Sequence, residues 1–414
     1  MQKDYVDQMN ELEMLGHAKI ADTTHQNSFY LPHHAVIKPT RTTTKMRIVF
    51  DATVKGSTGV SLNDKLMVGP RLQDDLVRLL IRFRSYCVAA GADIEKMFRQ
   101  VCVALEDQQF QKIIWRESSQ DAVREFVLTT IVFGMSCAPF LAVKVLQKLA
   151  ALECDEFSET KSVILNDFFM DDLLTGGDSS DNVIKLVSEL QTVLAKGKFP
   201  LRKWISNDKQ VLQSIDEKLR AHENVFDVPQ QDSCKALGLR WQPGADVFGY
   251  DVHFDVNNVP VTKRSILSVI ASLYDPLGLL APMVVKAKMI MQKIWRLGVE
   301  WDVCVSDEIK AEWFELYGSL NEVNNIVIPR WLGSYSTKCL EIHGFSDASS
   351  EAYSAVVYSR VKQDDGSYKS NIVIAKTRVA PIKQISTPQL ELCGALLLTR
   401  LMKYAVDSLK LDKI

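Results

Sequence analysis

Two adjacent aspartates, Asp171 and Asp172, interrupt the apolar stretch from Phe168 to Leu174. Adjacent carboxylates in apolar surroundings are costly, because their charges repel each other and burial removes the water that solvates them. A divalent cation offsets both costs, so the pair indicates a metal site. A loop pair that caps a helix is the alternative interpretation of the same residues.

A third acidic residue, Asp93, lies at the end of another apolar run. It stands 78 positions before Asp171 (171 − 93), so only the fold can bring the two carboxylates together. Carboxylate oxygens combined with substrate phosphates suit Mg²⁺ (or Mn²⁺). Two such ions could promote nucleotidyl transfer, one by lowering the pKa of a primer 3′-hydroxyl and the other by stabilising the pyrophosphate leaving group. The three aspartates are therefore the candidate catalytic and metal-binding residues.

Positive charge is concentrated in one segment near the N-terminus, although the net charge of the chain is only −2. Between positions 38 and 55 the chain has one acidic residue, Asp51, and these basic residues: Lys38, Arg41, Lys45, Arg47 and Lys55. A nucleoside triphosphate and a nucleic-acid template are both anionic, so this segment is a candidate surface for binding them. A solvated basic face is the alternative.

The composition limits the class of protein. A chain of 414 residues is too long for one core, so roughly two to three domains are expected. Apolar residues make up 47% and charged residues 24% of the chain, as in globular rather than disordered proteins. No apolar stretch approaches the roughly 20 residues of a membrane span, and no secretory signal is visible, so no membrane partner is expected. The eight cysteines stand singly, which favours free thiols over a zinc site or disulfides.

The spacing of apolar residues predicts an α+β fold around these positions. Helices are expected over residues 4–16, 74–86, 138–151 and 181–197. Strands are expected over residues 29–38, 46–53, 86–105, 111–116 and 126–133. The segment 163–177 predicts a strand, a tight turn at the aspartate pair and a second strand, and the turn would let Asp171 point into a cleft while Asp172 stays adjacent.

The second half of the chain predicts a change of architecture. Residues 236–241 and 247–254 have the pattern of a hairpin. Residues 262–318 are expected to be mainly helical, with a break at 275–282. A β-rich unit should begin near Lys338 and lead into a helix that contains Glu391.

Several of these strings, in this order, resemble the reverse transcriptase of Pao/BEL-type LTR retrotransposons. The resemblance extends from about Phe29 to Leu398. It is carried by YLPHHAVIKP (30–39), TKMRIVFDAT (44–53), SLNDKLMVGP (61–70), ADIEKMFRQV (92–101), VFGMSCAPFLA (132–142), FFMDDLLTGG (168–177), FPLRKWISN (199–207), TKRSILSVIASLYDPLGLLAP (262–282), HGFSDASSEAYSAVVY (343–358) and TPQLELCGALLL (387–398). One departure is Phe169, because many relatives carry a tyrosine at the first place of the aspartate motif.

The resemblance implies a fingers–palm–thumb core, a helical connection and a truncated RNase H-like α/β unit. The domains expected on this basis are an N-terminal helical segment (1–28), fingers and palm (29–255), a helical thumb or connection (256–335) and a partial RNase H-like domain (336–414). The activity implied is that of an RNA-directed DNA polymerase. Its partners would be an RNA template, a DNA primer/template and dNTPs, and its location would be intracellular and cytoplasmic, within a retroelement particle or outside one.

The resemblance also implies roles for individual residues. Asp93 corresponds to the first metal-binding aspartate of the palm, and Asp171 and Asp172 correspond to the pair on the palm hairpin. Residues that would contact the incoming dNTP are Lys45 and Arg47 in the fingers, Phe98 as a steric gate beneath the sugar, Phe133 and Gly134 against the nucleotide and template, and Lys203 in the palm. An arginine such as Arg47 can bind phosphate through two parallel hydrogen bonds. The alternatives are that Phe98 and Phe133 are core aromatics and that Lys203 is a solvated lysine.

In the RNase H-like part, Asp347 and Glu391 correspond to the first two carboxylates of a metal-dependent nuclease. Further acidic residues of that family would lie downstream of Ile414, so no RNase H activity is expected from the chain. Two alternatives to the polymerase remain at this stage. One is a catalytically silent nucleic-acid-binding remnant of a degenerate retroelement, and the other is a fragment without a stable fold.

Overall fold

The structure is a computed structural model that describes residues 2–22, 27–37, 46–221, 234–236, 239–252, 260–333 and 340–411. Lys45 lies outside these residues. The chain divides into two compact units. The first consists of Met1–Gln73, Ile94–Asp171 and Ser188–Leu201, and the second of Asp74–Asp93, Asp172–Val187 and Arg202–Ile414. Both units mix helices with antiparallel strands, as the α+β prediction requires.

The N-terminal part of the first unit is built on two small sheets. Strands β1 (Ala18–Ile20), β6 (Arg124–Leu128) and β5 (Lys112–Trp115) form one antiparallel sheet in that order, and β2 (His33–Ile37) pairs with β3 (Met46–Phe50) in the other. Helix α1 (Gln2–Met14) packs on β3. Met9 and Leu12 of the helix enter the same buried cluster as Ile48, Phe50 and Phe126, so the helix and both sheets share one core.

The rest of the first unit is mainly helical. It contains η1 (Met97–Gln100), α3 (Leu105–Gln108), η2 (Gln109–Gln111), α4 (Ala138–Glu153), α5 (Ser158–Asn166) and the two-residue strand β7 (Phe168–Phe169). Helix α4 packs on α5 and η1. Among the helices that the structure describes, none combines the length and the apolar character needed to cross a membrane.

Two sequence predictions in this region were wrong. The strand expected over 86–105 ends at Ile94, because Lys96 adopts a left-handed conformation (φ 53°) from which η1 begins. The first strand expected in 163–177 is reduced to β7, since residues up to Asn166 continue α5. Val163 and Ile164 are buried in that helix, and a short apolar run has the same pattern in a buried helix turn as in a strand.

The second unit contains the sheet that carries Asp93 and Asp172. Strands β8 (Asp172–Gly177), β4 (Val88–Ile94) and β9 (Leu201–Ser206) are neighbours in that order. Helix α2 (Leu76–Phe83) packs on β8, and its N-cap Asp75 accepts a hydrogen bond from the Arg78 amide at 3.0 Å. Helix α6 (Ser180–Lys196) follows β8, and α7 (Lys209–Gln213) and η3 (Glu217–Leu219) follow β9.

A second sheet of this unit joins segments that are distant in the sequence. Its order is β10 (Cys234–Ala236), β11 (Leu239–Gln242), β12 (Val247–Gly249) and β13 (Ile328–Pro329). The β11–β12 pair confirms the predicted hairpin. The helices between β12 and β13 are α8 (Lys263–Ser272), α9 (Ala281–Arg296), α10 (Asp307–Leu320) and η5 (Asn321–Asn325), and the gap between α8 and α9 falls at the predicted break.

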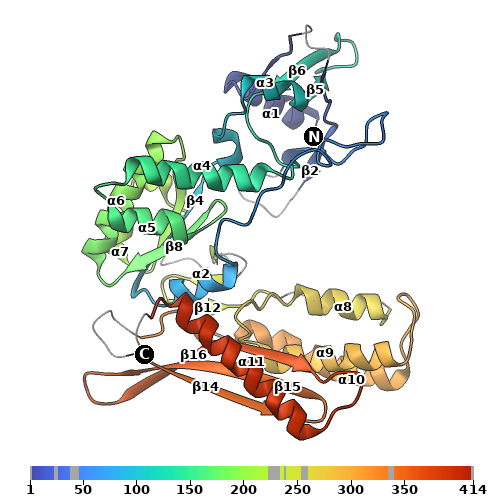
Figure 1. Ribbon diagram of the computed structural model, residues 1–414, viewed down its shortest axis with the longest axis vertical. Helices are drawn as coiled ribbons and strands as arrows, with labels where there is room; N and C mark the ends of the chain where they lie inside the picture. Colours follow the sequence, from blue (N-terminus) through green and yellow to red (C-terminus); the bar gives the residue numbers. More distant parts are fainter. Residues whose placement is uncertain are drawn as a thin grey trace. The chain divides into compact units, whose positions relative to one another are not determined.

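The C-terminal part of the second unit is a three-stranded antiparallel sheet covered by one long helix (Figure 1). The strands are β14 (Leu340–Ala348), β15 (Ala352–Lys362) and β16 (Tyr368–Val379), in that order. Helix α11 (Thr387–Ser408) begins at a capping box formed by Ser386 and Gln389, and it packs on β14 and β15. Helix α9 packs on the edge strand β16.

Candidate active site

The backbone pairing places two of the three candidate aspartates opposite each other. Strands β4 and β8 are antiparallel, and the last pair of their ladder is Asp93 with Asp172. Directly opposed residues project to the same face of a sheet, with Cβ atoms about 4.5–5.5 Å apart, and like charges in such a pair are destabilising. A cation on that face of the sheet would therefore be stabilised by the two carboxylates and would reduce their repulsion.

Asp171 lies in the turn that precedes β8. In the first unit, its carbonyl oxygen accepts a hydrogen bond from the Ile94 amide at 2.8 Å. The turn depends on Met170, which has a left-handed conformation (φ 55°) and whose amide donates to Gln73 Oε1 at 3.0 Å. The tight turn predicted at the aspartate pair is therefore present, and Asp171 is exposed there.

Lys203, on the neighbouring strand β9, supplies a positive charge to this face. Its Nζ donates to Asp93 Oδ2 at 2.7 Å. The Lys203 side chain is 52% exposed and the Asp93 side chain 26% exposed, so solvent screens the pair and its contribution to stability is small. Lys203 has a left-handed backbone (φ 55°), which is unusual for a residue with a side chain inside a strand.

The chemistry of these side chains fits Mg²⁺, although the ligands are not gathered in advance. Carboxylate oxygens are the donors that Mg²⁺ prefers. Within the described part of the chain, no group of three or more His, Cys, Asp or Glu side chains is arranged to hold a metal. Asp93 contacts Lys203 instead. Metal binding would thus require Asp93 to exchange a lysine partner for the ion.

A second group of candidate residues comes together within the first unit. The rings of Phe98 and Phe133 are in contact, with centroids 4.8 Å apart and planes tilted by 48°. The guanidinium carbon of Arg47 lies 6.0 Å from the Phe133 centroid. Phe133 is 45% exposed and Phe98 is only partly buried, so neither ring is enclosed in a core. The three side chains form a surface on which a base or sugar could pack.

The position after Phe133 requires a glycine, Gly134, for its backbone conformation and for lack of space. Its φ is +113°, and a Cβ there would lie 1.7 Å from the Phe50 carbonyl oxygen, so a side chain could not be accommodated. The carbonyl oxygen of Gly134 accepts a hydrogen bond from Asn63 Nδ2 at 2.9 Å, and Asn63 Oδ1 accepts from the Ser136 amide at 2.8 Å. Asn63, in the string SLND (61–64), was predicted only to mark a loop, so its contacts with Gly134 and Ser136 were not expected.

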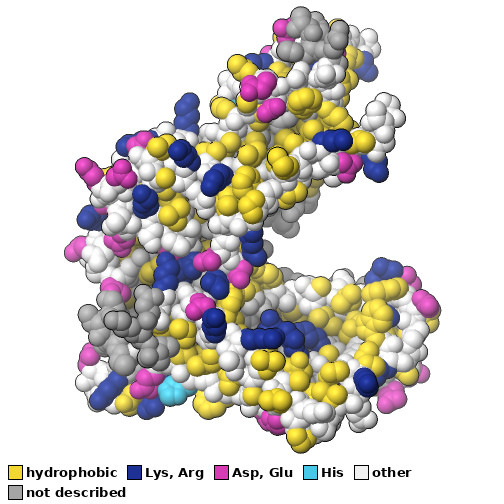
Figure 2. All heavy atoms as spheres, in the orientation of Figure 1, with side chains coloured by type: hydrophobic (Ala, Val, Ile, Leu, Met, Phe, Trp, Pro, Cys, Tyr) yellow, Lys and Arg dark blue, Asp and Glu magenta, His cyan; other side chains and the backbone are white. Residues whose placement is uncertain are grey.

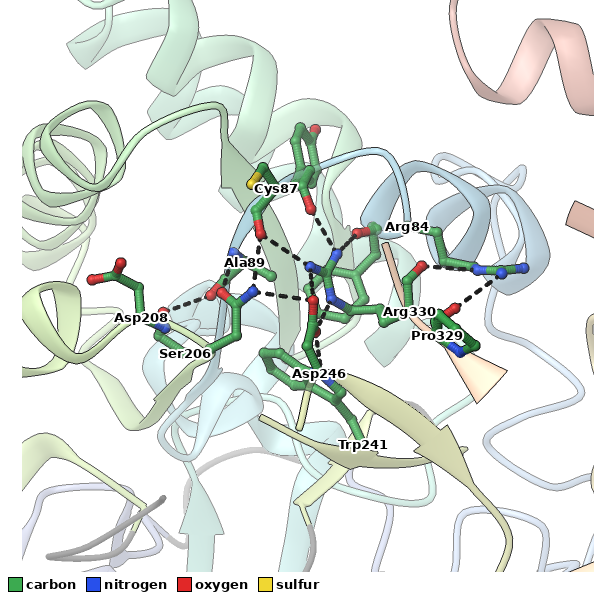
Figure 3. A network of polar contacts seen from close by, with 12 residues as sticks. Arg84, Cys87, Ala89, Ser206, Asp208, Trp241, Asp246, Pro329 and Arg330 are labelled. Carbon is green, nitrogen blue, oxygen red and sulfur yellow. Dashed lines mark hydrogen bonds and ion pairs between the residues drawn. The ribbon is translucent and has the colours of Figure 1, made fainter. Parts of the chain in front are cut away.

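A partly buried polar network anchors the strands of the Asp93 sheet (Figure 3). Asn207 holds β4 through its side chain, with Oδ1 accepting from the Ala89 amide at 2.8 Å and Nδ2 donating to the Cys87 carbonyl at 2.9 Å. The same Nδ2 donates to Asp246 Oδ2 at 3.2 Å. Ser206 Oγ donates to the Ala89 carbonyl at 2.7 Å. These contacts fix β4, the strand that carries Asp93.

Two fully buried arginines extend the network (Figure 3). Arg330 donates to both oxygens of Asp246, at 2.6 and 2.8 Å, and to the Tyr86 carbonyl at 2.8 Å. Arg84 has carbonyl partners instead of a carboxylate: Arg330 at 3.0 Å, Val373 at 3.0 Å and Pro329 at 3.2 Å. Burial and the nearby charge of Arg330 lower the pKa of Arg84 to about 9. The sequence carried no signal for either arginine.

The RNase H-like candidates lie at the junction of β14 and α11. Asp347 is exposed and pairs with Ser354 across the sheet. Helix α11 approaches the strand at Gly394, where a Cβ would lie 3.6 Å from the Asp347 carbonyl oxygen. Glu391 is exposed and precedes Gly394 by about one helical turn. The structure thus brings the Asp347 strand end and the Glu391 turn of the helix close together.

One protein family matches the C-terminal part of the chain. Residues 262–414 match the family described as Pao retrotransposon-like RNaseH-like domain. The match confirms the resemblance to Pao-type retrotransposons drawn from the sequence, and the RNase H-like assignment of the C-terminal unit. No sequence among the curated proteins matches the chain.

Two solved structures are similar in fold. One is a foamy viral protease-reverse transcriptase in complex with ds DNA, with a TM-score of 0.61 and 14% identity over 95% of this chain and 59% of that chain. The other is a foamy viral protease-reverse transcriptase in complex with an RNA/DNA hybrid, with a TM-score of 0.58 and 13% identity over 99% of this chain and 46% of that chain. The chain thus spans about half the length of these proteins, and it has the mixed α/β fold of reverse transcriptases.

Proposed function

We propose that this chain, whose residues 262–414 match the Pao retrotransposon-like RNaseH-like domain, is an RNA-directed DNA polymerase that adds dNTPs to a primer 3′-hydroxyl on an RNA or DNA template. The observation that carries the proposal is the pairing of Asp93 with Asp172 across β4 and β8, with Asp171 as the next residue in the turn. Strands β4 and β8 thereby bring two carboxylates to the same face of the sheet. The similarity in fold to reverse transcriptases supports the same conclusion.

The chain's own residues would hold the reactants as follows. Asp93, Asp171 and Asp172 would hold Mg²⁺ or Mn²⁺, which supplies activation of the 3′-hydroxyl and stabilises charge on pyrophosphate. Arg47 would bind the triphosphate through two parallel hydrogen bonds, and Lys45, two positions earlier in the sequence, would add a positive charge. Phe98 would lie under the sugar against Phe133. Gly134 allows the backbone to approach closely because it has no side chain.

The finer domain assignment is part of the proposal. We assign fingers and palm to residues 29–255, the helical thumb or connection to 256–335 and the RNase H-like domain to 336–414, after an N-terminal helical segment at 1–28. Asp347 and Glu391 would be the first carboxylates of a nuclease site.

Primer extension tests the proposal directly. Extension of a DNA primer on an RNA template with dNTPs and Mg²⁺ is compared for the wild type, Asp171→Asn and the matched control Asp347→Asn. We expect extension by the wild type and the control but not by Asp171→Asn. A wild type that binds the hybrid without extending it would contradict the proposal, and extension by Asp171→Asn would contradict the site.

A further inference from the structure

Glu11, on helix α1, forms ion pairs with two basic residues of the first unit, Lys96 and Arg99. Lys96 Nζ donates a hydrogen bond to Glu11 Oε1, and Arg99 Nη1 lies 3.6 Å from Glu11 Oε2. Burial raises the pKa of the Glu11 carboxyl, but the hydrogen bond from Lys96 and the charge of Arg99 lower this pKa by more, so Glu11 is ionised at neutral pH. Phe98 stands between the two basic residues in the chain. One carboxylate thus contacts residues on both sides of the ring that is the candidate sugar contact.

The turn that carries Phe98 depends on contacts of this kind. It is the single 3-10 turn η1, closed by a hydrogen bond from the Arg99 amide to the Lys96 carbonyl at 2.8 Å. Hydrogen-bond geometry in such turns is poor, and Lys96 enters this one in the left-handed conformation (φ 53°), which is unfavourable for a residue with a side chain. Met97 is buried and α4 packs on η1, so the turn is restrained by α4 and by Glu11 of α1.

The same face of α1 contacts the strand that carries Arg47. Gln8 Nε2 donates to the Met46 carbonyl at 2.6 Å, and Met46 directly precedes Arg47 on β3. Gln8 and Glu11 are three residues apart on the helix, so their side chains are neighbours. Helix α1 therefore contacts both segments that provide candidate nucleotide-binding residues, β3 with Arg47 and η1 with Phe98.

Loss of the Glu11 carboxylate would leave two positive charges without their shared partner on one short turn. Lys96 and Arg99 lie close together because both contact the same carboxylate, and like charges at short range repel each other. Since Phe98 lies between them in the chain, this repulsion would displace its ring.

We propose that Glu11 is a positioning residue for sugar selection: by holding Lys96 and Arg99, it keeps Phe98 where the ring excludes a ribose 2′-hydroxyl. Glu11 acts only through Phe98 and not by contact with a reactant. The inference rests on the proposed function, because it assigns to the same site the residue that controls its choice between dNTPs and ribonucleotides.

Nucleotide binding by the full chain on an RNA/DNA hybrid with a dideoxy-terminated primer, in Ca²⁺, tests the inference without turnover. The affinities for dTTP and UTP are compared, and in Glu11→Ala we expect the affinity for UTP relative to dTTP to rise roughly three- to fivefold, the scale of a partly exposed ion pair. Glu11→Gln, which keeps a hydrogen-bond acceptor for Lys96, should show a smaller rise. Figure 2 shows acidic side chains at several places in the region of α1, α3 and β6, so a control for charge is needed. Glu13→Ala provides it, because Glu13 is an exposed glutamate of the same helix outside this contact.

A double variant tests whether Glu11 acts through the ring. Glu11→Ala combined with Phe98→Ala should have the same ratio of affinities as Phe98→Ala alone, because the ring on which Glu11 acts is then absent. Additive rises would overturn the inference, and so would an equal rise in Glu13→Ala. An unchanged ratio in Glu11→Ala would also overturn it, since a lowered melting temperature would then show that the ion pairs serve stability alone. A wild type that prefers dTTP to UTP through Glu11 but does not extend a primer would contradict the proposed polymerase activity and leave this role of Glu11 supported.

Discussion

Asp93 and Asp347 occupy similar places in two different sheets of the same unit. Each lies at or near the end of a strand in an antiparallel sheet. Asp93 faces a second aspartate, Asp172, and contacts Lys203, whereas Asp347 faces Ser354. The two aspartates therefore differ in the residue that faces them across the sheet, a second carboxylate for Asp93 and a neutral hydroxyl for Asp347. The density of negative charge around each aspartate decides how strongly a cation is needed.

The largest expected effect follows from this difference in charge density. Asp93→Asn removes one carboxylate of the opposed pair without changing its size, and we expect primer extension to fall roughly a thousandfold or more, as when a group that acts on the reacting atoms is lost. Asp347→Asn should change it less than about twofold. Single-turnover extension with saturating dNTP measures both. Equal losses in the two variants would show that the two sites are not distinct in function.

The second prediction concerns Arg330, the buried arginine that binds Asp246. Asp246→Ala leaves Arg330 buried and without its carboxylate, and such a loss destabilises a protein by about 3–5 kcal/mol. Asp302→Ala is the matched control, because Asp302 forms an ion pair of similar length (2.7 Å) with Arg264 on the surface. It should cost less than about 1 kcal/mol. Urea unfolding of both variants measures the difference. Similar free energies of unfolding would mean that the network adds nothing beyond a surface ion pair.

Much of the fold could be predicted from apolar spacing. The helices near 74–86, 138–151 and 181–197 and the hairpin around residue 244 are present, because each buries one face against a neighbouring element. The strand over 86–105 was predicted too long, because the left-handed turn at Lys96 has no apolar signature. Periodicity shows which residues are buried, but not where a backbone turns.

The candidate site could be predicted as a set of residues but not as a geometry. The sequence indicated that Asp93 and the aspartate pair would meet, but the register that sets Asp172 rather than Asp171 opposite Asp93 depends on strand pairing 79 positions apart (172 − 93). The contact of Lys203 with Asp93 depends on a third strand. Arg84 binds carbonyl groups 245 to 289 positions away. Every residue has a backbone carbonyl group, so the sequence does not indicate which of them an arginine will bind.

A third prediction sharpens the role of the aromatic pair. Phe98→Ala removes the ring that contacts Phe133 and opens space beneath the sugar, so incorporation of ribonucleotides relative to deoxyribonucleotides should rise roughly tenfold. Phe110→Ala is the control, because Phe110 is a partly exposed phenylalanine (37%) of the same unit, outside the pair. Competition between UTP and dTTP on one template measures the ratio. An unchanged ratio in Phe98→Ala would remove the steric role.

The smallest expected effect concerns Lys203, the lysine that contacts Asp93. Lys203 and a metal ion both neutralise Asp93, so Lys203→Met should lower the Mg²⁺ concentration for half-maximal extension by roughly two- to fivefold, the scale of an exposed ion pair. The KM for dNTP should rise at the same time, because a cation near the triphosphate is lost.

Lys198→Met is a matched control, since Lys198 is also exposed and has a similar left-handed backbone (φ 58°). Opposite shifts in the Mg²⁺ and dNTP requirements separate this role from simple destabilisation, which would weaken both. If Lys203→Met needs more Mg²⁺ than the wild type, the lysine supports the metal site instead of competing with it, and the difference from Asp347 then lies in the opposed aspartates alone.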